Sequence, residues 1–471
     1  MKPDLDLMFC AGVNRMLFHG TCFSPKDEAW PGWQFYASVD MSPTNTIWRD
    51  AGYLMQYIER CQRFLQWGQP DNDFLVYLPV RDMWHQQTQQ RLMQFDIHSM
   101  ATKAADFIRA ILIIDSLGFD SDYISERYLL TTTFDGECLR TAAGTTYRAL
   151  IIPGDSRLSE AVRQHLQALE AKGARIIREL TAEALMQVAR PESMKTELGL
   201  KMIRRSHPSA APAGATSHHY FIANLTPHDV DAIVPLAVDF SRSTWIDPMI
   251  SSAPYAAEVH DGQLRVRLRS GESRLLWTEN NTSAGAPGST LVEDSHVTVT
   301  GAEPDTLFLT RGWNLTFMDS TPAVAESFRL DSLSTWEGLG QQFAEMMGTG
   351  VYECTFNIDS EEQAQRLWQI DLGDVRESAR VSVNEKEIGC AWAVPFVLQL
   401  PEGVLRKGKN LLRIEVTNLP ANHIAALDRQ QVPWRKFEDI NVVDINYRRS
   451  TYENWSPMPS GLKGPVCIIS R

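Results

Sequence analysis

The stretch that decides the fold of the C-terminal part begins with Asp371-Leu372-Gly373-Asp374-Val375 and continues to Gly408-Lys409-Asn410-Leu411-Leu412. The first motif predicts a strand that ends in a turn, and the second predicts a turn that starts the next strand. Between them, Val383-Asn384 predicts the tip of a hairpin, because asparagine tolerates a left-handed backbone. Strands of β-sandwich dimensions are predicted at 351–356, 367–372, 379–383 and 410–418.

The part from residue 4 to about 177 has a different pattern, in which short apolar strands alternate with amphipathic helical stretches. This alternation predicts an α/β architecture, and strands that are apolar on both faces indicate a parallel sheet. The expected elements are a strand at 74–79, a helix at 107–117, a strand at 147–153, a helix at 159–171 and a strand at 174–177. A helix over 49–67 precedes them.

Beyond about residue 200 the helical periodicity gives way to short alternating strands, such as those predicted at 220–224 and 264–268. The sequence NNTSAGAPG at 280–288 is rich in small residues and proline, and it predicts a linker between two β-rich parts.

Near the N-terminus, residues 12–19 predict a buried strand whose end delivers His19 to a loop. That loop is rich in aromatic residues, which are Trp30, Trp33, Phe35, Tyr36 and Trp48. Aromatic faces commonly stack on the apolar face of a sugar ring through dispersion, so this loop is a candidate sugar-binding subsite.

Composition excludes several classes of protein. The chain has 471 residues and a formal net charge of -13, which argues against nucleic acid as a partner. No apolar run is long enough to span a bilayer, and the first residues lack the features of a signal peptide. The seven cysteines are widely spaced and contain no CxxC pair, so neither a disulfide framework nor a zinc site is indicated.

The C-terminal motifs, together with Trp392, Pro395-Phe396 and Val416-Thr417-Asn418, resemble the galactose-binding-like jelly roll attached to many glycoside hydrolases. With Gly12-Val13-Asn14-Arg15 and the closing Ser460-Gly461-Leu462-Lys463-Gly464-Pro465-Val466, the chain resembles the C-terminal portion of glycoside hydrolase family 106, the α-L-rhamnosidase family.

This resemblance implies an order of domains. Residues 1–72 would be the C-terminal end of a (β/α)8 catalytic barrel, 73–195 a Rossmann-like α/β domain, 196–285 a small β-sandwich, and 300–471 the galactose-binding-like jelly roll. A complete barrel needs roughly 250 residues, so we expect only its final unit here and a chain that is truncated at its N-terminus.

The resemblance also implies a function. The intact protein would hydrolyse oligosaccharides or polysaccharides of plant or complex origin with two carboxylates, in the periplasm or outside the cell, and calcium would serve as its cofactor. In the family the carboxylates lie on earlier barrel strands, so we expect them to precede Met1 and assign neither a catalytic residue nor a metal ligand in this chain. Two alternatives are a β-galactosidase- or β-glucuronidase-like hydrolase and a non-catalytic carbohydrate-binding or scaffold fragment.

His19, Trp30 and Trp33 are the candidate substrate-binding residues. For His19, the position at the end of a predicted strand favours a role in substrate binding, because barrel enzymes place groups that touch substrate there. The alternative is a buried histidine that hydrogen-bonds to a neighbouring backbone group. For the two tryptophans the alternative is that they close the rim of the barrel around a Pro31-Gly32 turn.

Other polar residues have simpler explanations. Asp27 and Glu28 are expected to be solvated loop charges, because acid and base in an inverting hydrolase stand roughly 6.5–9.5 Å apart across the sugar. Asp50 could pair with Arg49, but we expect it to cap the following helix.

Asp71-Asn72-Asp73 lacks the rest of a calcium loop and predicts a turn. Asp155-Ser156 follows a predicted parallel strand, where a doubly wound sheet can bind a ligand, but no nucleotide or nucleophile motif accompanies it.

In the terminal sandwich, a glycan-binding face is an open possibility for Trp392, Asn418, Asn422, Trp434 and Asp444, with Trp392 expected in the core. The polar region around Asn422, His423 and Asp428 could face the active site of the intact protein.

Overall fold

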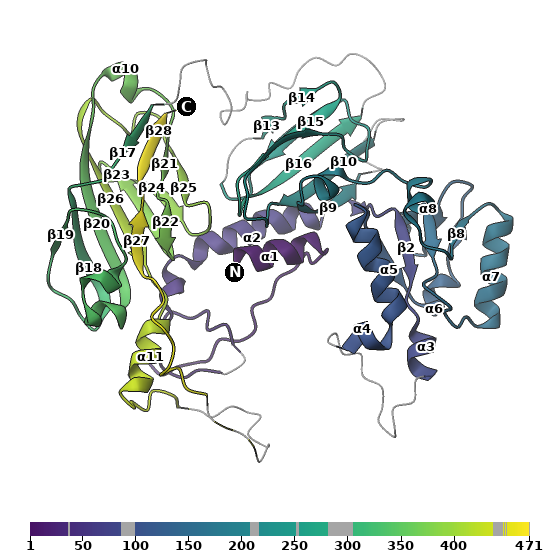
Figure 1. Cartoon of the computed structure of the whole chain (residues 1–471), viewed down its shortest axis with the longest axis horizontal. Coiled ribbons are helices and arrows are strands. Elements are labelled where there is room, and N and C mark those ends of the chain that lie inside the picture. The colour runs from purple at the N-terminus through teal and green to yellow at the C-terminus, as the bar shows by residue number, and fades with distance from the viewer. Residues whose placement is uncertain are drawn as a thin grey trace. The chain divides into compact units, whose positions relative to one another are not determined.

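A computed structural model describes the chain except for residues 36–37, 86–98, 208–215, 251–253, 281–304, 437–445, 447, 449 and 471. The fold is mixed α/β with many β-sheets (Figure 1). Contacts divide the chain into two compact units. Unit 1 comprises Met1, Pro3–Asn14 and Arg60–Glu293, and unit 2 comprises Lys2, Arg15–Glu59 and Asp294–Arg471.

Unit 1 contains a parallel sheet with the strand order β3-β2-β7-β8. Its strands are β3 (Ser121–Ile124), β2 (Phe74–Tyr77), β7 (Ala149–Ile151) and β8 (Arg175–Ile177). The longer helices of this region are α5 (Ala105–Ser116) and α7 (Glu160–Ala171), and Ser159 caps α7 by accepting from the Val162 amide at 3.2 Å. The predicted βαβ unit over 147–177 is confirmed.

Both faces of this sheet are covered, because alternate residues of a strand point to opposite sides. Phe74 and Val76 pack into one buried cluster with Phe107 of α5. Leu75 and Tyr77 pack into another cluster with Leu166 of α7. This arrangement explains why β2 is apolar at every position. Shorter elements complete the region: α3 (Val80–His85), α4 (Met100–Lys103), α6 (Glu126–Leu129), β4 (Thr133–Phe134), β5 (Leu139–Arg140), β6 (Thr146–Tyr147), α8 (Ala182–Met186) and α9 (Ser193–Thr196).

The rest of unit 1 is antiparallel. A six-stranded sheet has the order β1 (Gln69–Pro70), β9 (Lys201–Ser206), β10 (Thr216–Ala223), β16 (Ser273–Asn280), β12 (Arg242–Ile246), β13 (Tyr255–Ala256). A three-stranded sheet has the order β11 (Val230–Val234), β15 (Gln263–Leu268), β14 (Val259–His260). Tyr220 and Ile222 of the first sheet share a buried cluster with Leu264 and Val266 of the second. Phe9 of α1 (Lys2–Cys10) packs edge-on against Phe221 at 5.4 Å between ring centroids.

A buried histidine pair joins two strands of the six-stranded sheet. Nε2 of His207 and Nδ1 of His219 are 2.7 Å apart, and the two side chains are 3% and 1% exposed. The ring of Trp277 lies nearly parallel to that of Trp67, with 5.0 Å between their centroids, and both tryptophans contact the histidines. Burial lowers the pKa of His219 to about 3, so both rings are uncharged at neutral pH.

Unit 2 is an antiparallel β-sandwich preceded by residues 15–59. Its six-stranded sheet has the order β19 (Phe328–Leu330), β18 (Trp313–Thr321), β20 (Met347–Ile358), β26 (Gly408–Thr417), β23 (Ser378–Val383), β24 (Lys386–Ala391). Its four-stranded sheet has the order β17 (Thr306–Phe308), β28 (Cys467–Ser470), β21 (Trp368–Asp371), β25 (Val397–Leu400). β22 (Asp374–Arg376) pairs with β27 (Gly461–Gly464). The helices are η1 (Thr46–Arg49), the part of α2 (Ala51–Leu65) up to Glu59, η3 (Trp336–Leu339), η4 (Gln341–Ala344), α10 (Glu361–Ala364) and α11 (Ala421–Arg429).

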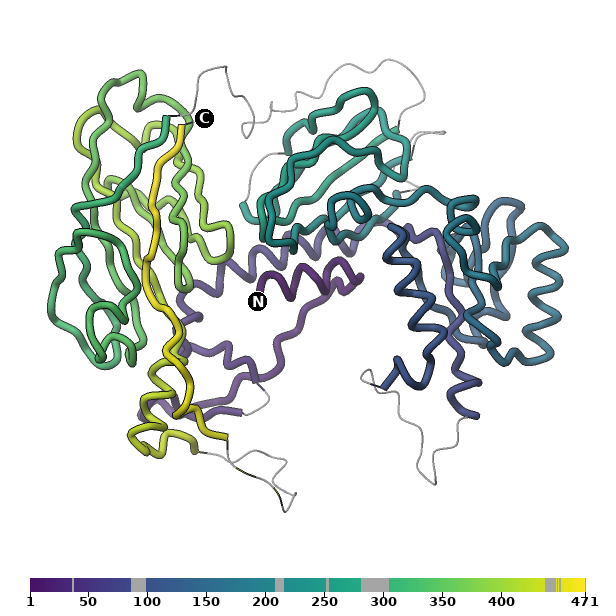
Figure 2. The backbone as a smooth tube through the Cα atoms, viewed as in Figure 1, coloured from purple at the N-terminus to yellow at the C-terminus, as the bar shows by residue number. Residues whose placement is uncertain are grey.

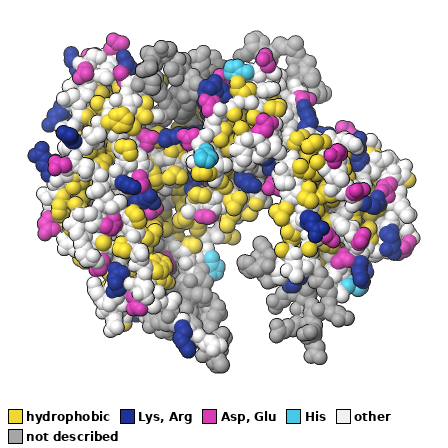
Figure 3. Space-filling view, in the orientation of Figure 1, with side chains coloured by type: hydrophobic (Ala, Val, Ile, Leu, Met, Phe, Trp, Pro, Cys, Tyr) yellow, Lys and Arg dark blue, Asp and Glu magenta, His cyan; other side chains and the backbone are white. Residues whose placement is uncertain are grey.

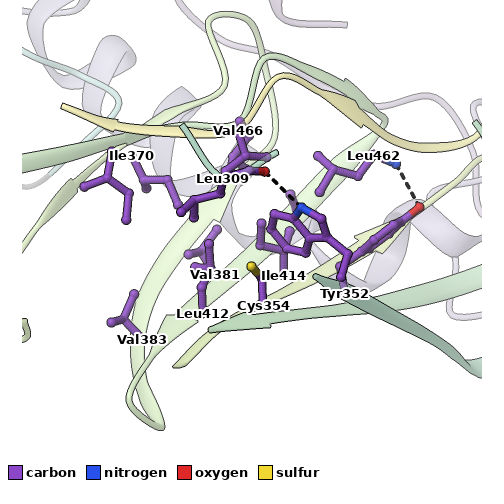
Figure 4. Close-up of a cluster of buried hydrophobic side chains, with 14 of the residues drawn as sticks. Leu309, Tyr352, Cys354, Ile370, Val381, Val383, Leu412, Ile414, Leu462 and Val466 are labelled. Carbon is purple, nitrogen blue, oxygen red and sulfur yellow. Dashed lines mark hydrogen bonds between the residues drawn. The ribbon is translucent and has the colours of Figure 1, made fainter. Parts of the chain in front are cut away.

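The core of the sandwich lies between these sheets (Figure 4). The Tyr352 hydroxyl, which is fully buried, accepts hydrogen bonds from Nε1 of Trp336 at 2.7 Å and from the Leu462 amide at 3.0 Å. The indole of Trp313 donates to the Leu309 carbonyl at 3.0 Å. The buried hydroxyl of Tyr352 and the buried indole N–H groups of Trp313 and Trp336 therefore have partners within the core, as a low-dielectric interior requires.

The turn chemistry read from the sequence is confirmed. Asn384 has a φ of 50° at the tip of the β23–β24 hairpin, and β26 starts at Gly408. The strands predicted at 351–356, 367–372, 379–383 and 410–418 correspond to β20, β21, β23 and β26. All seven cysteines are free thiols.

The buried strand predicted at 12–19 is wrong. Residues 13–20 are in neither helix nor strand, and Leu17 is 94% exposed. The apolar run lacks the pairing that a strand needs, since no described strand hydrogen-bonds to it. The assignment of 1–72 to a barrel and the domain boundaries stay predictions, and most of the predicted linker at 280–288 lies outside the described residues.

We expect the stability of the protein to fall as the pH falls from about 6.5 toward 3, because the unfolded chain can protonate His219 and the folded chain cannot. One such group contributes at most about 1.4 kcal/mol per pH unit. Urea unfolding of unit 1 between pH 7 and 5 should show a shallower pH slope in His219→Gln. His228→Gln, at an exposed position of the same unit, is the control and should keep the wild-type slope. Identical slopes in His219→Gln and wild type would contradict the assignment.

Tyr352→Phe should destabilise unit 2, because it leaves two buried N–H donors without an acceptor at about 1–3 kcal/mol each. Tyr53→Phe is the matched control, since its hydroxyl donates to Glu387 at 3.0 Å near the surface, and we expect it to cost under about 1 kcal/mol. Chemical denaturation of both variants measures the difference. Equal losses would show that the Tyr352 hydroxyl does not carry these bonds.

Candidate carbohydrate-binding site

The aromatic loop of unit 2 is held by its own side chains. Nε1 of Trp30 donates to the Thr44 carbonyl at 2.8 Å, and Nε1 of Trp33 donates to Oε2 of Glu28 at 3.0 Å. The Trp33 amide donates to Oγ of Ser24 at 3.1 Å. Gly32 has a φ of 81°, and a Cβ there would lie 2.3 Å from the same Ser24 oxygen. Only glycine therefore allows the turn between the two tryptophans.

This loop lies beside the C-terminal segment that contains α11, as the purple and yellow tubes of Figure 2 show. The rings of Trp30 and His423 are 5.0 Å apart at their centroids. Nζ of Lys436 lies 2.9 Å from Oε1 of Glu28, and this hydrogen bond lowers the pKa of Glu28. Glu28 is thus an ionised, paired group, and it is a poor candidate for a proton donor.

Asp428, at the end of α11, organises a second set of aromatic residues. Its carboxylate accepts from Nε1 of Trp434 at 2.7 Å and from the Tyr452 amide at 2.7 Å. The guanidinium of Arg435 lies 4.8 Å from the centroid of Trp434 and 5.7 Å from that of Tyr452. Trp455, which is half exposed, lies 4.6 Å from Tyr452. Trp434 is itself buried, so Trp455 is the ring of this set that presents a large apolar face to solvent.

Asn422 and His423 have structural roles. The Asn422 amide donates to the Met458 carbonyl and accepts from the Met458 amide, both at 2.8 Å. Nδ1 of His423 lies 3.3 Å from the Glu345 carbonyl, and burial lowers the pKa of this histidine. Asn418 bonds the Met346 carbonyl and the Gly348 amide. These side chains fix the backbone around α11.

Residues 46–50 attach the aromatic loop to the sandwich. Asp50 is 5% exposed, and its carboxylate accepts from Nε of Arg380 at 2.6 Å and from the Ser378 hydroxyl. Arg49 pairs with Glu415, and Oγ1 of Thr46 donates to the Asn418 carbonyl at 2.5 Å. The expected capping role of Asp50 is wrong, because both of its oxygens bond strand β23.

The structure separates the three predicted substrate-binding residues into two groups. Trp30 and Trp33 are half buried in the loop next to α11, while the exposed His19 packs its ring 5.7 Å from Phe35. The carbonyl of His19 accepts from the Val39 amide at 3.3 Å. Their role in substrate binding stays a prediction. Trp392 is partly buried, with its ring 5.6 Å from that of Tyr57.

Sequence analysis missed Arg435, Tyr452 and Trp455. The spacing of Tyr452 and Trp455 in Thr451-Tyr452-Glu453-Asn454-Trp455 was the available signal. Tyr36 and Asp444 lie outside the described residues.

Across the described parts of the chain, no group of three or more His, Cys, Asp or Glu side chains is arranged to hold a metal ion. Calcium in the intact protein, which the resemblance implies, stays a prediction. Acidic and basic side chains are interspersed over the face in Figure 3. No described helix is long and apolar enough to cross a membrane.

Half-buried and exposed aromatic rings gather around the loop and α11, and such rings can stack on sugars. Comparisons with known proteins are consistent with a carbohydrate-active protein. Residues 1–187 match the family model of glycoside hydrolase family 106, described as alpha-L-rhamnosidase. The resemblance to that family is thus confirmed over these residues.

Two relatives extend this finding. A putative beta-glucuronidase from Formosa agariphila is 27% identical over 183 residues, which are 35% of this chain and 16% of that protein. The solved structure of a rhamnosidase from Novosphingobium sp. PP1Y matches 100% of this chain and 46% of its own, with a TM-score of 0.69 and 19% identity. The chain therefore has the fold of part of a rhamnosidase structure and spans less than half of it.

Asp428→Ala should release both Trp434 and the Tyr452 amide. Loss of one hydrogen bond to a carboxylate costs about 1.5–3 kcal/mol, so we expect the Tyr452 amide to exchange with solvent at least tenfold faster. Hydrogen exchange measures this directly. Asp27→Ala, at an exposed position of the same unit, is the control. Unchanged exchange at Tyr452 in Asp428→Ala would contradict the role of Asp428.

Proposed function

We propose that this chain is part of an α-L-rhamnosidase-like glycoside hydrolase that acts on plant or complex polysaccharides outside the cytoplasm. The observation that carries the proposal is the family match over 1–187, because those residues include the aromatic loop. The fold of the whole chain, which is that of part of a rhamnosidase structure, supports it.

Within this proposal the loop binds sugar. The indole N–H groups of Trp30 and Trp33 already bond Thr44 and Glu28, so their ring faces are what they offer to a ligand. A ring face attracts the C–H face of a pyranose through dispersion and its quadrupole. His19 is exposed and can exchange a hydrogen bond with a sugar hydroxyl.

Hydrolysis would use an acid and a base carboxylate on opposite sides of the glycosidic bond. Glu28 does not suit either role, since its carboxylate is engaged by Lys436 and Trp33. We therefore assign neither role to this loop, and we place residues 1–72 at the end of a (β/α)8 barrel whose strands would supply the two carboxylates.

A second candidate is a β-glucuronidase-like hydrolase, which the similarity to the putative beta-glucuronidase of Formosa agariphila favours. The two candidates differ in the charge of the substrate, because a glucuronide carries a carboxylate and a rhamnoside does not. A hydrolase for glucuronides needs a cation at that carboxylate. Lys436, in the C-terminal segment beside the loop, pairs with the Glu28 carboxylate that also accepts from Trp33, so its charge is already engaged.

Calorimetric titration of the chain with rhamnose-containing oligosaccharides should show binding, and Trp30→Ala or Trp33→Ala should weaken it about tenfold, equal to about 1.4 kcal/mol. Trp84→Ala is the control, since Trp84 is 69% exposed on unit 1. Aryl α-L-rhamnosides, β-D-glucuronides and β-D-galactosides should be assayed in parallel.

Each result decides between the candidates. Selective binding or cleavage of glucuronides would replace the proposal by the second candidate. Binding of rhamnosides that is unaffected by Trp30→Ala and Trp33→Ala would remove the loop from the site. Absence of both binding and cleavage with every sugar would overturn the proposal.

A further inference from the structure

The strand order of the parallel sheet in unit 1 reverses at β2. The chain passes from β2 to β3, which pairs with one edge of β2, and then returns to β7, which pairs with the other edge of β2. The connections that leave β2 and β7 therefore diverge, and open α/β sheets bind ligands at such a point, outside the carboxyl ends of the strands.

A cavity of about 280 Å³ lies at this point. Pro79 and Asp82, which follow β2, form one side of it, and Pro153, Asp155 and Ser156, which follow β7, form another. The third side is the α4–α5 junction, from Thr102 to Phe107. Three separate segments of the chain thus converge on one hollow.

The lining combines acceptors, donors and apolar surface. Asp82, Asp106 and Asp155 contribute carboxylates, which accept hydrogen bonds. The first amides of α5 have no intrahelical partner, and its N-cap, Ala104, supplies no side-chain acceptor. Pro79, Phe107 and Pro153 contribute apolar surface.

The Asp106 carboxylate has room at the cavity wall because residue 154 is a glycine. Gly154 has a φ of 54°, and a Cβ on it would lie 2.4 Å from Oδ2 of Asp106. A glycine between Pro153 and Asp155 therefore leaves room for this carboxylate at the cavity wall. Asp82 is fixed too, because its two oxygens accept from the Arg157 amide at 2.9 and 3.1 Å.

The charges of the lining select among ligands. Asp106 pairs with Arg109 at 3.1 Å and Asp82 lies 3.8 Å from Arg157, so with Lys103 the positive charges balance the three carboxylates and favour a neutral ligand. No metal-binding cluster exists among the described residues. The volume of about 280 Å³ lies just below the range of roughly 300–1,000 Å³ for ligand pockets, which is small for a dinucleotide. The sequence also lacks a glycine-rich phosphate loop. A neutral ring with several hydroxyls can hydrogen-bond to the exposed Asp155 carboxylate and to the helix amides together, and its C–H face can lie on the apolar floor that Pro79, Phe107 and Pro153 form.

We propose that this cavity binds a single neutral sugar ring, either a free monosaccharide or the end of a glycan. The site is independent of the aromatic loop of unit 2, and it adds a second sugar-binding position to the chain.

Saturation-transfer NMR of the full chain with L-rhamnose, D-galactose, D-glucose and D-glucuronate tests the proposal, and a matched oligosaccharide distinguishes a free sugar from a glycan end. We expect binding of at least one neutral sugar at millimolar concentration. In a Trp30→Ala background, which removes binding by the loop, Ala105→Trp should weaken that binding at least tenfold, because Ala105 is an exposed residue of the cavity wall. Asp155→Asn should weaken it as well, and it serves as the second variant if Ala105→Trp fails to fold.

Ala143→Trp, at an exposed position outside the cavity, is the control for the added indole. Trp30→Ala should leave the signal of this cavity intact, which separates failure here from failure of the proposed function. Preference for the anionic sugar, absence of binding by neutral sugars, or binding unaffected by Ala105→Trp and Asp155→Asn would each overturn the proposal.

Discussion

Arg49 and Asp50 are neighbours of opposite charge, and each forms an ion pair with a residue on a different strand of the sandwich in unit 2. Arg49 pairs with Glu415 on β26, and Asp50 pairs with Arg380 on β23. Arg380 and Glu415 lie directly opposite each other in the register of these strands. The positive and negative charges of Arg49 and Asp50 therefore lie against the negative and positive charges of the cross-strand pair Glu415 and Arg380. Asp50 is largely shielded from water, which strengthens its attraction to Arg380, and removal of Arg380 would leave the Asp50 charge poorly solvated. Glu415 is also held by Arg413 at 2.9 Å. The aromatic loop before residue 46 is anchored to the sandwich through these ion pairs.

Local chemistry explains how much of the fold could be predicted. The Asn384 turn and the start of β26 at Gly408 follow from the backbone preferences of single residues. The parallel sheet follows from strands that are apolar on both faces. The predicted strand at 12–19 failed because an apolar run does not specify a pairing partner, and Leu17 remains 94% exposed.

Charged contacts between distant segments could not be predicted. Asp71 and Asp73 were explained by a turn, yet they and Glu192 surround Arg204, which is 7% exposed. For the candidate site, the sequence pointed to the right kind of residue in Trp30 and Trp33. It gave no sign that Trp30 lies against His423 or that Lys436 holds Glu28. Those contacts arise only when the sandwich brings α11 beside the loop.

The free thiols have a practical consequence. Cys61, Cys354, Cys390 and Cys467 are buried, whereas Cys22 is partly exposed in the segment that leads into the aromatic loop. Burial raises the pKa of the Cys10 thiol, and burial also raises that of Cys138, which makes both slower nucleophiles. Cys22 is therefore a natural attachment point for a thiol-reactive fluorophore, which would report on events at the tryptophans without any engineered residue.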